Sequence, residues 1–201
     1  MNIYVESNFV LELALLQEQH TSCEDIVRLC EGGNAQLVIP AYVLIEPYDT
    51  LGRRHKQRQR MKAELDQELR QLARTATYVH RLGGFQHLTA LLIDSAHEEA
   101  RRLEDTRSRL LRMAQVIPLE ASVLAAATRY QVDHDLSPQD ALVYAAVLAH
   151  LKQSSASESC FLNKNSKDFD DPDLVEELHT YNCKLMPRFD TGYQFILSRM
   201  A

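Results

Sequence analysis

No apolar run in the sequence approaches the length needed to span a bilayer, so a membrane-spanning helix is not expected. The first residues also lack a basic region followed by an apolar stretch, which disfavours a signal peptide. These two absences lead us to expect a cytoplasmic protein. The chain has 201 residues, of which 45% are hydrophobic, and this is enough to bury a substantial core. A single domain over residues 1–201 is therefore the expected organisation.

Familiar metal-binding and redox motifs are missing as well. The four cysteines form no Cys-x-x-Cys pair and the eight histidines form no His-Glu-x-x-His pattern, so a zinc site is disfavoured. Cys23 and Cys30 lie seven residues apart, which places them on one face of a helix, whereas Cys160 and Cys183 lie in short apolar runs. We expect buried, reduced thiols that pack as small hydrophobic residues.

Positive charge is not in excess, because the net charge of the chain is −6. This balance argues against broad nonspecific binding to nucleic acid. The charge is unevenly distributed, however, since residues 53–62 hold six Lys or Arg and no Asp or Glu. Two interpretations of this segment are open: a solvated helix face, or a surface that contacts a nucleic-acid backbone. The aromatic residues near it are few, Tyr42 and Tyr48, so a platform for stacking bases is not indicated.

Short apolar strands alternate with helical patterns along the chain. Strands are expected at residues 2–5, 36–39, 160–162 and 183–186. Helices are expected at residues 8–18 with Ser7 as N-cap, 22–31 before Gly32-Gly33, 42–51 with a kink at Pro47, 120–131, 138–151 and 171–180. This alternation predicts an α/β fold in which helices cover both faces of a mostly parallel sheet.

Two longer helical patterns, at residues 53–80 and 89–115, differ from the rest. Their apolar residues form narrow stripes, and charged residues fill most of the remaining positions. Gly83 and Gly84 separate the two patterns. We therefore predict an antiparallel helical hairpin over residues 53–115, inserted within the single domain.

Four acidic residues lie at the ends of the apolar segments. Glu6, Glu46 and Asp168 each follow a predicted strand, and Asp140 lies in the first turn of a predicted helix. Ligands of open parallel sheets bind beyond the carboxyl ends of the strands, so these side chains are placed to converge there. Clustered carboxylates repel one another unless a cation or a proton holds them, which points to Mg²⁺ or Mn²⁺.

Each acid also has a simpler interpretation. Ser137-Pro138-Gln139-Asp140 fits a capping box, with Ser as N-cap, Pro at the first helical position and the acid at the third. Asp168 fits an acidic turn before a helix, and Glu6 and Glu46 fit solvated positions near helix starts. Asp133-His134-Asp135 is interpreted as a polar loop, with an extra metal ligand or a proton shuttle as the alternative. The order of the acids along the chain is more specific than any one of them.

That order and its flanking residues resemble the PIN-domain nucleases, a ribonuclease family that includes VapC-like toxins. Tyr4 to Val10 resembles the family's opening strand, which is followed by Asp, then Ser or Thr, then Asn. Glu46, after Ile39-Pro40, resembles the second acid, and Leu136 to Ala146 resembles the helix with the third. Phe161 to Phe169 resembles the last strand and its Thr-Arg-Asn-x-x-Asp-Phe motif.

The resemblance covers residues 1–50 and 118–187, whereas residues 53–115 have no counterpart in the small single-domain toxins of the family. It implies a PIN-like three-layer α/β/α fold with a mostly parallel central sheet and an inserted helical hairpin. It also implies metal-dependent cleavage of single-stranded RNA, as by the toxin of a toxin–antitoxin pair. The partners expected on this basis are an antitoxin protein and a second copy of the chain.

The resemblance also assigns roles to individual residues. Mg²⁺ or Mn²⁺ binding and catalysis fall to Glu6, Glu46, Asp140 and Asp168. A role in orienting a carboxylate or a water molecule falls to Ser7, Asn8 and Asn165. The metal would activate water for attack on a phosphodiester, so no protein nucleophile is required. Contacts to the RNA backbone are assigned on other grounds, because the basic segment begins soon after Glu46; the candidates are Arg53, Arg54, Lys56, Arg58 and Arg60.

Two residues depart from the family pattern. Glu6 stands where Asp is usual, which lengthens the side chain by one methylene, and Asn163 stands where a hydroxyl residue is usual. A first hypothesis is an active PIN-type ribonuclease. A second is a PIN-like RNA- or protein-binding module whose metal site is degenerate and weakly active or inactive. A third is a metal-dependent phosphohydrolase of another α/β family, although no glycine-rich phosphate loop supports it.

Overall fold

The computed structural model describes residues 1–78, 81–82, 85–164, 169 and 171–200. Within these residues, the central sheet has five parallel strands in the order β3-β2-β1-β4-β5. The strands are β1 (Asn2–Val5), β2 (Gln36–Pro40), β3 (Gln115–Ile117), β4 (Ser159–Leu162) and β5 (Cys183–Met186). In the centre, β1 pairs Asn2 with Gln36 of β2 and with Ser159 of β4. The predicted parallel sheet is confirmed.

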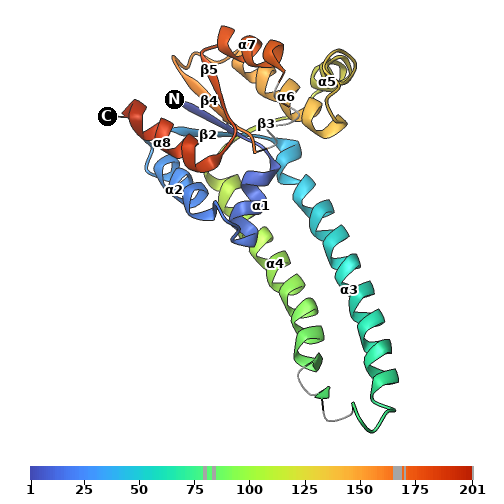
Figure 1. The fold of residues 1–201 in the computed structure, drawn as a ribbon. Coiled ribbons are helices and arrows are strands. Elements are labelled where there is room, and N and C mark those ends of the chain that lie inside the picture. Colours follow the sequence, from blue (N-terminus) through green and yellow to red (C-terminus); the bar gives the residue numbers. More distant parts are fainter. Residues whose placement is uncertain (79–80, 83–84, 165–168, 170, 201) are drawn as a thin grey trace.

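Helices cover both faces of this sheet (Figure 1). One face carries α1 (Ser7–Leu15), α2 (His20–Glu31) and α8 (Phe189–Met200). The other face carries α5 (Ala121–Asp133), α6 (Pro138–Leu151) and α7 (Pro172–Thr180). The three layers confirm the predicted α/β/α arrangement. Because both faces are covered, the central strands are apolar without alternation, and Ile3, Tyr4 and Val5 of β1 are all fully buried.

The approach of α8 to the sheet depends on a glycine. An added Cβ at Gly192 would lie 2.5 Å from Cδ2 of Leu162, the last residue of β4. A side chain there would require Leu162 to move, so Gly192 permits the close packing of α8 on the end of β4.

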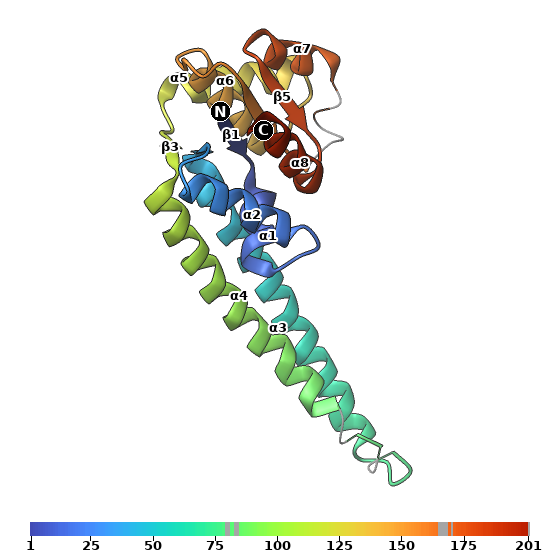
Figure 2. The same cartoon turned by 90° about the vertical axis from the view of Figure 1, so that its left-hand side faces the viewer.

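A pair of long helices projects from the body (Figures 1 and 2). They are α3 (Glu46–Leu72) and α4 (Phe85–Met113), which pack against each other. The predicted helices at 53–80 and 89–115 are shifted. The first starts and ends earlier than expected, and the second starts earlier. Gly83 and Gly84 lie outside the described residues. The assignment of residues 53–115 as an insert in a single domain stays a prediction.

The hairpin is joined to the body through α4. Leu103 and Leu110 are each 1% exposed and belong to the main hydrophobic core. Arg109 donates to Glu24 at 2.7 and 3.1 Å and to Glu31 at 2.8 and 2.9 Å, and so links α4 to α2. These hydrogen bonds raise the pKa of Arg109. The base of the hairpin is therefore fixed to the body by packing and by charge.

Several local predictions were wrong in detail. Ser7 is not the N-cap of the first helix; Glu6 takes that place and accepts a hydrogen bond from the Asn8 amide. Helix α1 also ends at Leu15 rather than at residue 18, because Leu16 adopts a left-handed conformation with φ 53°. Pro47 makes no kink, since it lies in the first turn of α3, where its missing N–H leaves no hydrogen bond unmade.

The segment predicted as a helix at 42–51 is divided. A 3₁₀ helix (η1, Ala41–Leu44) follows β2, and α3 begins directly after Ile45. The sequence did not predict β3 or α8. The first is a three-residue edge strand, too short for a periodic pattern, and the second contains Gly192, a poor helix former.

Two further predictions concern the cysteines and a membrane-spanning helix. Cys23, Cys160 and Cys183 are free and buried, and Cys30 is free and partly buried. Burial raises the pKa of the Cys30 thiol to about 12, which keeps it protonated at neutral pH. Among the described helices, none is both long enough and apolar enough to cross a bilayer.

Candidate active site

Glu6 is the residue around which the site is built. It follows β1 directly, and only 7% of its surface is exposed. The carboxylate accepts hydrogen bonds from two backbone amides: Asn8 N–H at 2.6 Å on one oxygen and Lys164 N–H at 3.2 Å on the other. Asn8 lies in the first turn of α1 and Lys164 follows β4, so Glu6 sits at the carboxyl ends of two neighbouring strands.

The protonation of Glu6 is unusual for a carboxyl group. Its pKa is raised to about 7, chiefly because burial disfavours the charged form and in smaller part because the Asp140 carboxylate repels it. The amides of Asn8 and Lys164 act in the opposite direction. The effect of Asp140 on Glu6 shows that α6 brings its carboxylate to the same end of the sheet.

Glu46 reaches this place through Ser7. The Ser7 hydroxyl donates a short hydrogen bond to Oε2 of Glu46, the first residue of α3. Tyr42, on η1, is also near, since the pKa of its phenol is raised by burial and then by the carboxylates of Glu46, Asp49 and Asp140. One charged neighbourhood therefore includes residues from β1, η1, α3 and α6.

Asp140 lies in the capping arrangement that the sequence predicted, whereas its role as a metal ligand stays a prediction. Ser137 is the N-cap of α6: its hydroxyl oxygen accepts from the Asp140 amide at 3.1 Å and donates to the Asp140 carboxylate at 2.6 Å. Pro138 follows in the first turn of the helix, as expected for a helix start. The capping arrangement orients Asp140, and the same side chain acts electrostatically on Glu6.

Two predicted residues, Asp168 and Asn165, lie outside the described residues. Phe169, which directly follows Asp168, has a defined position in the core. Phe169 is 1% exposed and packs against Tyr144 and Phe161, with ring centroids 5.8 Å apart in both cases. Among the residues that the structure describes, no three Asp, Glu, His or Cys side chains form a group able to hold a metal ion.

His134 has a structural contact that its sequence pattern did not specify. Its Nδ1 lies 2.7 Å from Oδ2 of Asp171, and this contact lowers the pKa of the Asp171 carboxyl. Asp171 also caps α7, by accepting from the Asp173 amide at 2.9 Å. His134 thus connects the loop before α6 to the start of α7.

The predicted RNA-binding residues do not all present free charge. Arg53, Lys56 and Arg60 are exposed on α3, and Arg54 is partly buried. Arg53 is close enough to Tyr42 to lower the pKa of its phenol, so it lies beside the carboxylates. Arg58 is different, because its guanidinium is held by both oxygens of Glu99 on α4, at 2.7 and 2.9 Å.

Sequence reasoning missed a charged pair beside the site. Glu12 on α1 is 1% exposed, and its carboxylate accepts from the Lys164 ammonium at 2.5 Å. The sequence did contain a signal, since Glu12 interrupts an apolar helix between Leu11 and Leu13. A charge in that position is buried and needs a partner, but the partner lies 152 residues away.

The sequence and the fold can now be compared with those of known proteins. A search of curated proteins finds no match. One solved structure that matches is that of VapBC2 from Rickettsia felis bound to a DNA fragment from their promoter, with 10% identity and a TM-score of 0.44. That match covers 92% of this chain and 98% of the other. A family model described as PIN domain matches residues 3–169, and PIN domains are generally nucleases. Since the match spans most of the sequence, the chain belongs to the PIN domain family.

Proposed function

We propose that this protein is an endoribonuclease that uses Mg²⁺ or Mn²⁺ to cleave single-stranded RNA. The observation that carries the proposal is the position of Glu6, a buried carboxylate at the carboxyl end of β1 that the Asp140 carboxylate repels. Glu46 is joined to the same place through Ser7. A divalent cation relieves such repulsion, and carboxylate oxygens are the ligands that Mg²⁺ and Mn²⁺ prefer.

The chain's own residues would divide the work as follows. Glu6, Glu46 and Asp140 would hold the cation. They do not form a metal-binding group among the described residues, so the proposal requires them to draw together on binding and Asp168 to complete the set. Each described carboxylate has a fixed orientation, because Ser7 holds Glu46, Ser137 holds Asp140, and backbone amides hold Glu6. When bound, the metal supplies an activated water and neutralises charge on the phosphate oxygens. Asn8 and Asn165 are proposed to orient a carboxylate or a water molecule.

The start of α3 is the proposed path for the RNA backbone. This helix begins with Glu46, and the basic residues follow within its next turns. The exposed side chains of Arg53, Lys56 and Arg60 are proposed to contact phosphates, with a smaller contribution from Arg54. Arg58 contributes least, because Glu99 already neutralises it.

A second candidate function is a binding module with a weakened metal site. The observation that favours it is Glu6 itself, because a pKa of about 7 leaves much of this carboxyl protonated at neutral pH. A protonated carboxyl is a poor metal ligand. A role as a toxin, an antitoxin partner and a homodimer rest on the sequence resemblance and stay predictions. The cytoplasmic location rests on the sequence composition and also stays a prediction.

Replacement of Asp140 by Asn tests the ribonuclease. We expect Asp140→Asn to abolish Mn²⁺-dependent cleavage of an unstructured, end-labelled RNA, because the ligand charge is lost while the shape of the cap is kept. The matched control is Asp173→Asn, which changes an exposed acid in the first turn of α7, a helix that also has a capped N-terminus. The control should cleave like the unchanged protein, and both variants should unfold within a few degrees of it.

Two results would overturn the proposal. One is a purified protein that neither cleaves RNA with Mg²⁺ or Mn²⁺ nor gains thermal stability from either cation. The other is full activity of Asp140→Asn. Cleavage of single-stranded DNA of the same sequence, in place of RNA, would keep the nuclease but change its substrate.

A further inference from the structure

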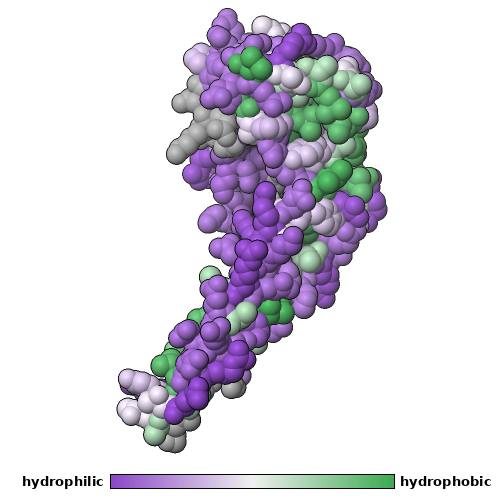
Figure 3. Space-filling view, turned by 90° about the vertical axis from the view of Figure 1, so that its right-hand side faces the viewer, coloured by the Kyte–Doolittle hydropathy of each residue, from purple (hydrophilic) through white to green (hydrophobic). Residues whose placement is uncertain are grey.

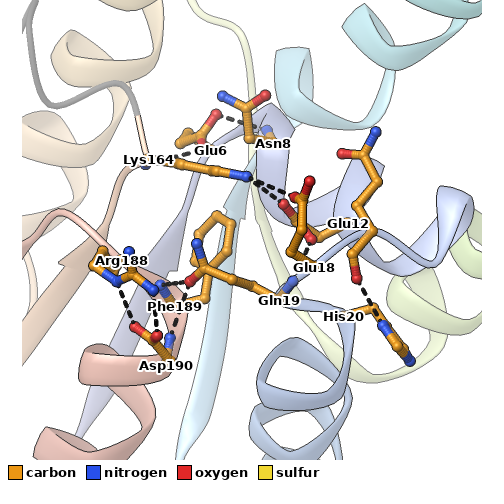
Figure 4. Close-up of polar contacts among 11 residues, drawn as sticks. Glu6, Asn8, Glu12, Glu18, Gln19, His20, Lys164, Arg188, Phe189 and Asp190 are labelled. Carbon is orange, nitrogen blue, oxygen red and sulfur yellow. Dashed lines mark hydrogen bonds and ion pairs between the residues drawn. The ribbon is translucent and has the colours of Figure 1, made fainter.

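Lys164 makes two contacts that link the candidate site to a buried charge (Figure 4). Its backbone N–H donates to Oε1 of Glu6 at 3.2 Å, and its ammonium donates to Oε1 of Glu12 at 2.5 Å. A second acid, Glu18, lies 3.6 Å from the same ammonium. The residue is therefore held at both its backbone and the end of its side chain, and the first of these contacts is made to Glu6.

Glu12 is a firm anchor for that side chain. Its carboxylate is 1% exposed, on a helix that is otherwise buried on this face, and its second oxygen accepts from the Gln19 amide at 2.8 Å. A buried carboxylate is strongly unfavourable unless it is paired and hydrogen-bonded. Glu12 has both kinds of partner, and the pairing raises the pKa of the Lys164 ammonium. The Lys164 ammonium is consequently charged at neutral pH.

The anchor extends further into the body through Gln19. The side-chain oxygen of Gln19 accepts from the amides of Phe189 and Asp190, at 2.8 and 3.2 Å, at the start of α8. Phe189 is fully buried and packs edge-on against Phe9 of α1, with ring centroids 5.4 Å apart. Figure 4 shows the chain of contacts from Glu6 to Asp190. Lys164 is thus connected, through Glu12 and Gln19, to the buried start of α8.

We propose that Lys164, anchored by Glu12, is a positioning residue that fixes the Glu6 carboxylate for the reaction. The inference rests on the proposed nuclease function. The ion pair holds residue 164 so that its N–H stays on one oxygen of Glu6, while the Asn8 N–H occupies the other. With the ion pair broken, residue 164 gains freedom and Glu6 loses one of its two amide donors. Lys164 does not touch substrate in this role.

A purely structural ion pair would give the same loss of stability, so the test must separate the two roles. Lys164→Met leaves Glu12 buried and uncompensated, and we expect a clear fall in melting temperature. The double variant Glu12→Gln with Lys164→Met removes both charges, and we expect most of that fall to be recovered. Lys164→Arg keeps the charge and the backbone amide. The matched control is Arg199→Met, which breaks an exposed ion pair with Glu158 outside this chain of contacts.

The decisive measurement is the amide resonance of Asn8 in ¹H–¹⁵N spectra of the metal-free protein. Asn8 reports on Glu6 because it donates to the second carboxylate oxygen. In the double variant we expect this resonance to shift and kcat with Mn²⁺ to fall about 10- to 100-fold, the usual effect of losing a residue that orients a metal ligand. Lys164→Arg, which keeps the charge, should recover most of the Asn8 shift and most of kcat relative to the double variant, and the control Arg199→Met should leave both quantities as they are.

An unchanged Asn8 resonance and unchanged kcat in the double variant would overturn the inference. If the double variant does not fold, Glu12→Asp replaces it, because this change keeps the charges and only shortens the anchor. A shifted Asn8 resonance in Glu12→Asp supports the inference, and an unshifted one overturns it. Absence of cleavage by the unchanged protein would defeat the proposed function alone, since the Asn8 resonance is read without metal or RNA.

Discussion

The body and the hairpin of this protein are stabilised in different ways. In the body, strands and helices far apart in sequence bury a continuous core, and Ile3, Tyr4 and Val5 of β1 are fully buried. In the hairpin, the leucines of α4 that join this core, Leu110 and Leu103, are 1% exposed, whereas Leu91 and Leu88 in its outer turns are 60% and 49% exposed. Figure 3 shows a largely hydrophilic hairpin surface with scattered apolar residues.

The difference teaches that the outer turns of the hairpin depend on its attachment to the body. Two helices alone bury little apolar surface, so a long hairpin needs an attachment. Here the attachment is α4, through Leu110 and the ion pairs of Arg109 with Glu24 and Glu31. Ion pairs such as Arg58 with Glu99 add cross-links further along, but partly exposed pairs contribute little each.

The largest effect is expected from a leucine pair along α4. Leu110→Ala should lower the free energy of unfolding by about 2–5 kcal/mol, because it leaves a cavity where the hairpin joins the core. Leu91→Ala, on the exposed part of the same helix, should change it by no more than about 0.5 kcal/mol. Urea denaturation measures both. Equal losses would mean that the outer hairpin has a core of its own, contrary to the comparison.

A pH-dependent effect is expected from the body alone. Because the pKa of Glu6 is about 7 in the folded protein and 4.5 is its ordinary value, the metal-free folded state keeps a proton that the unfolded chain loses. The stability associated with that proton is fully present below pH 4.5 and is lost as the pH rises to about 7. The shift corresponds to roughly 3 kcal/mol as an upper value.

Glu6→Gln checks this effect. The variant should unfold at a higher temperature than the unchanged protein at pH 8 and should show no such advantage at pH 4.5. Leu91→Ala, on the hairpin, should leave the pH dependence unaltered. A Glu6→Gln variant with the same pH profile as the unchanged protein would show that Glu6 titrates normally and that burial does not control it.

The smallest effect is expected from a test of whether α3 of the hairpin binds RNA. Arg53→Gln with Lys56→Gln should weaken RNA binding and reduce the salt dependence of log K by about 0.7 for each charge that contacts a phosphate. Arg58→Gln is the matched control, since Glu99 already engages its charge and little change is expected. Fluorescence anisotropy at several salt concentrations measures the slope. Identical slopes for all three proteins would remove α3 from RNA binding.

Much of the body could be predicted from its sequence because the signals are local. The apolar run at Asn2–Val5 and the Ser137-Pro138 helix start depend on neighbouring residues, and both elements lie where expected. Pro47 was misjudged because proline has opposite meanings inside a helix and in its first turn. These two cases are distinguished only by where the helix starts, and η1 determines that position for α3.

The assignment of the candidate site residues stays a prediction, and the contacts that orient them were not predicted. Glu6 and Glu46 were selected because each follows a predicted strand, and Asp140 because it lies in the first turn of a predicted helix. The partners that orient them could not be predicted. Lys164 to Glu12, Ser7 to Glu46 and Gln19 to Phe189 all join segments distant in sequence. Such pairs follow from the folded arrangement and leave no periodic pattern.

One feature of α3 has a mechanical meaning. This helix is continuous from Glu46 to Leu72, a rod about 40 Å long at 1.5 Å per residue. Glu46 is its first residue, so a candidate ligand and the far end of the hairpin belong to a single lever. A displacement of the outer turns would tilt this helix about the point where α4 is attached to the body, and so would shift the Glu46 carboxylate. The position of the hairpin and the geometry of the site are in this sense coupled.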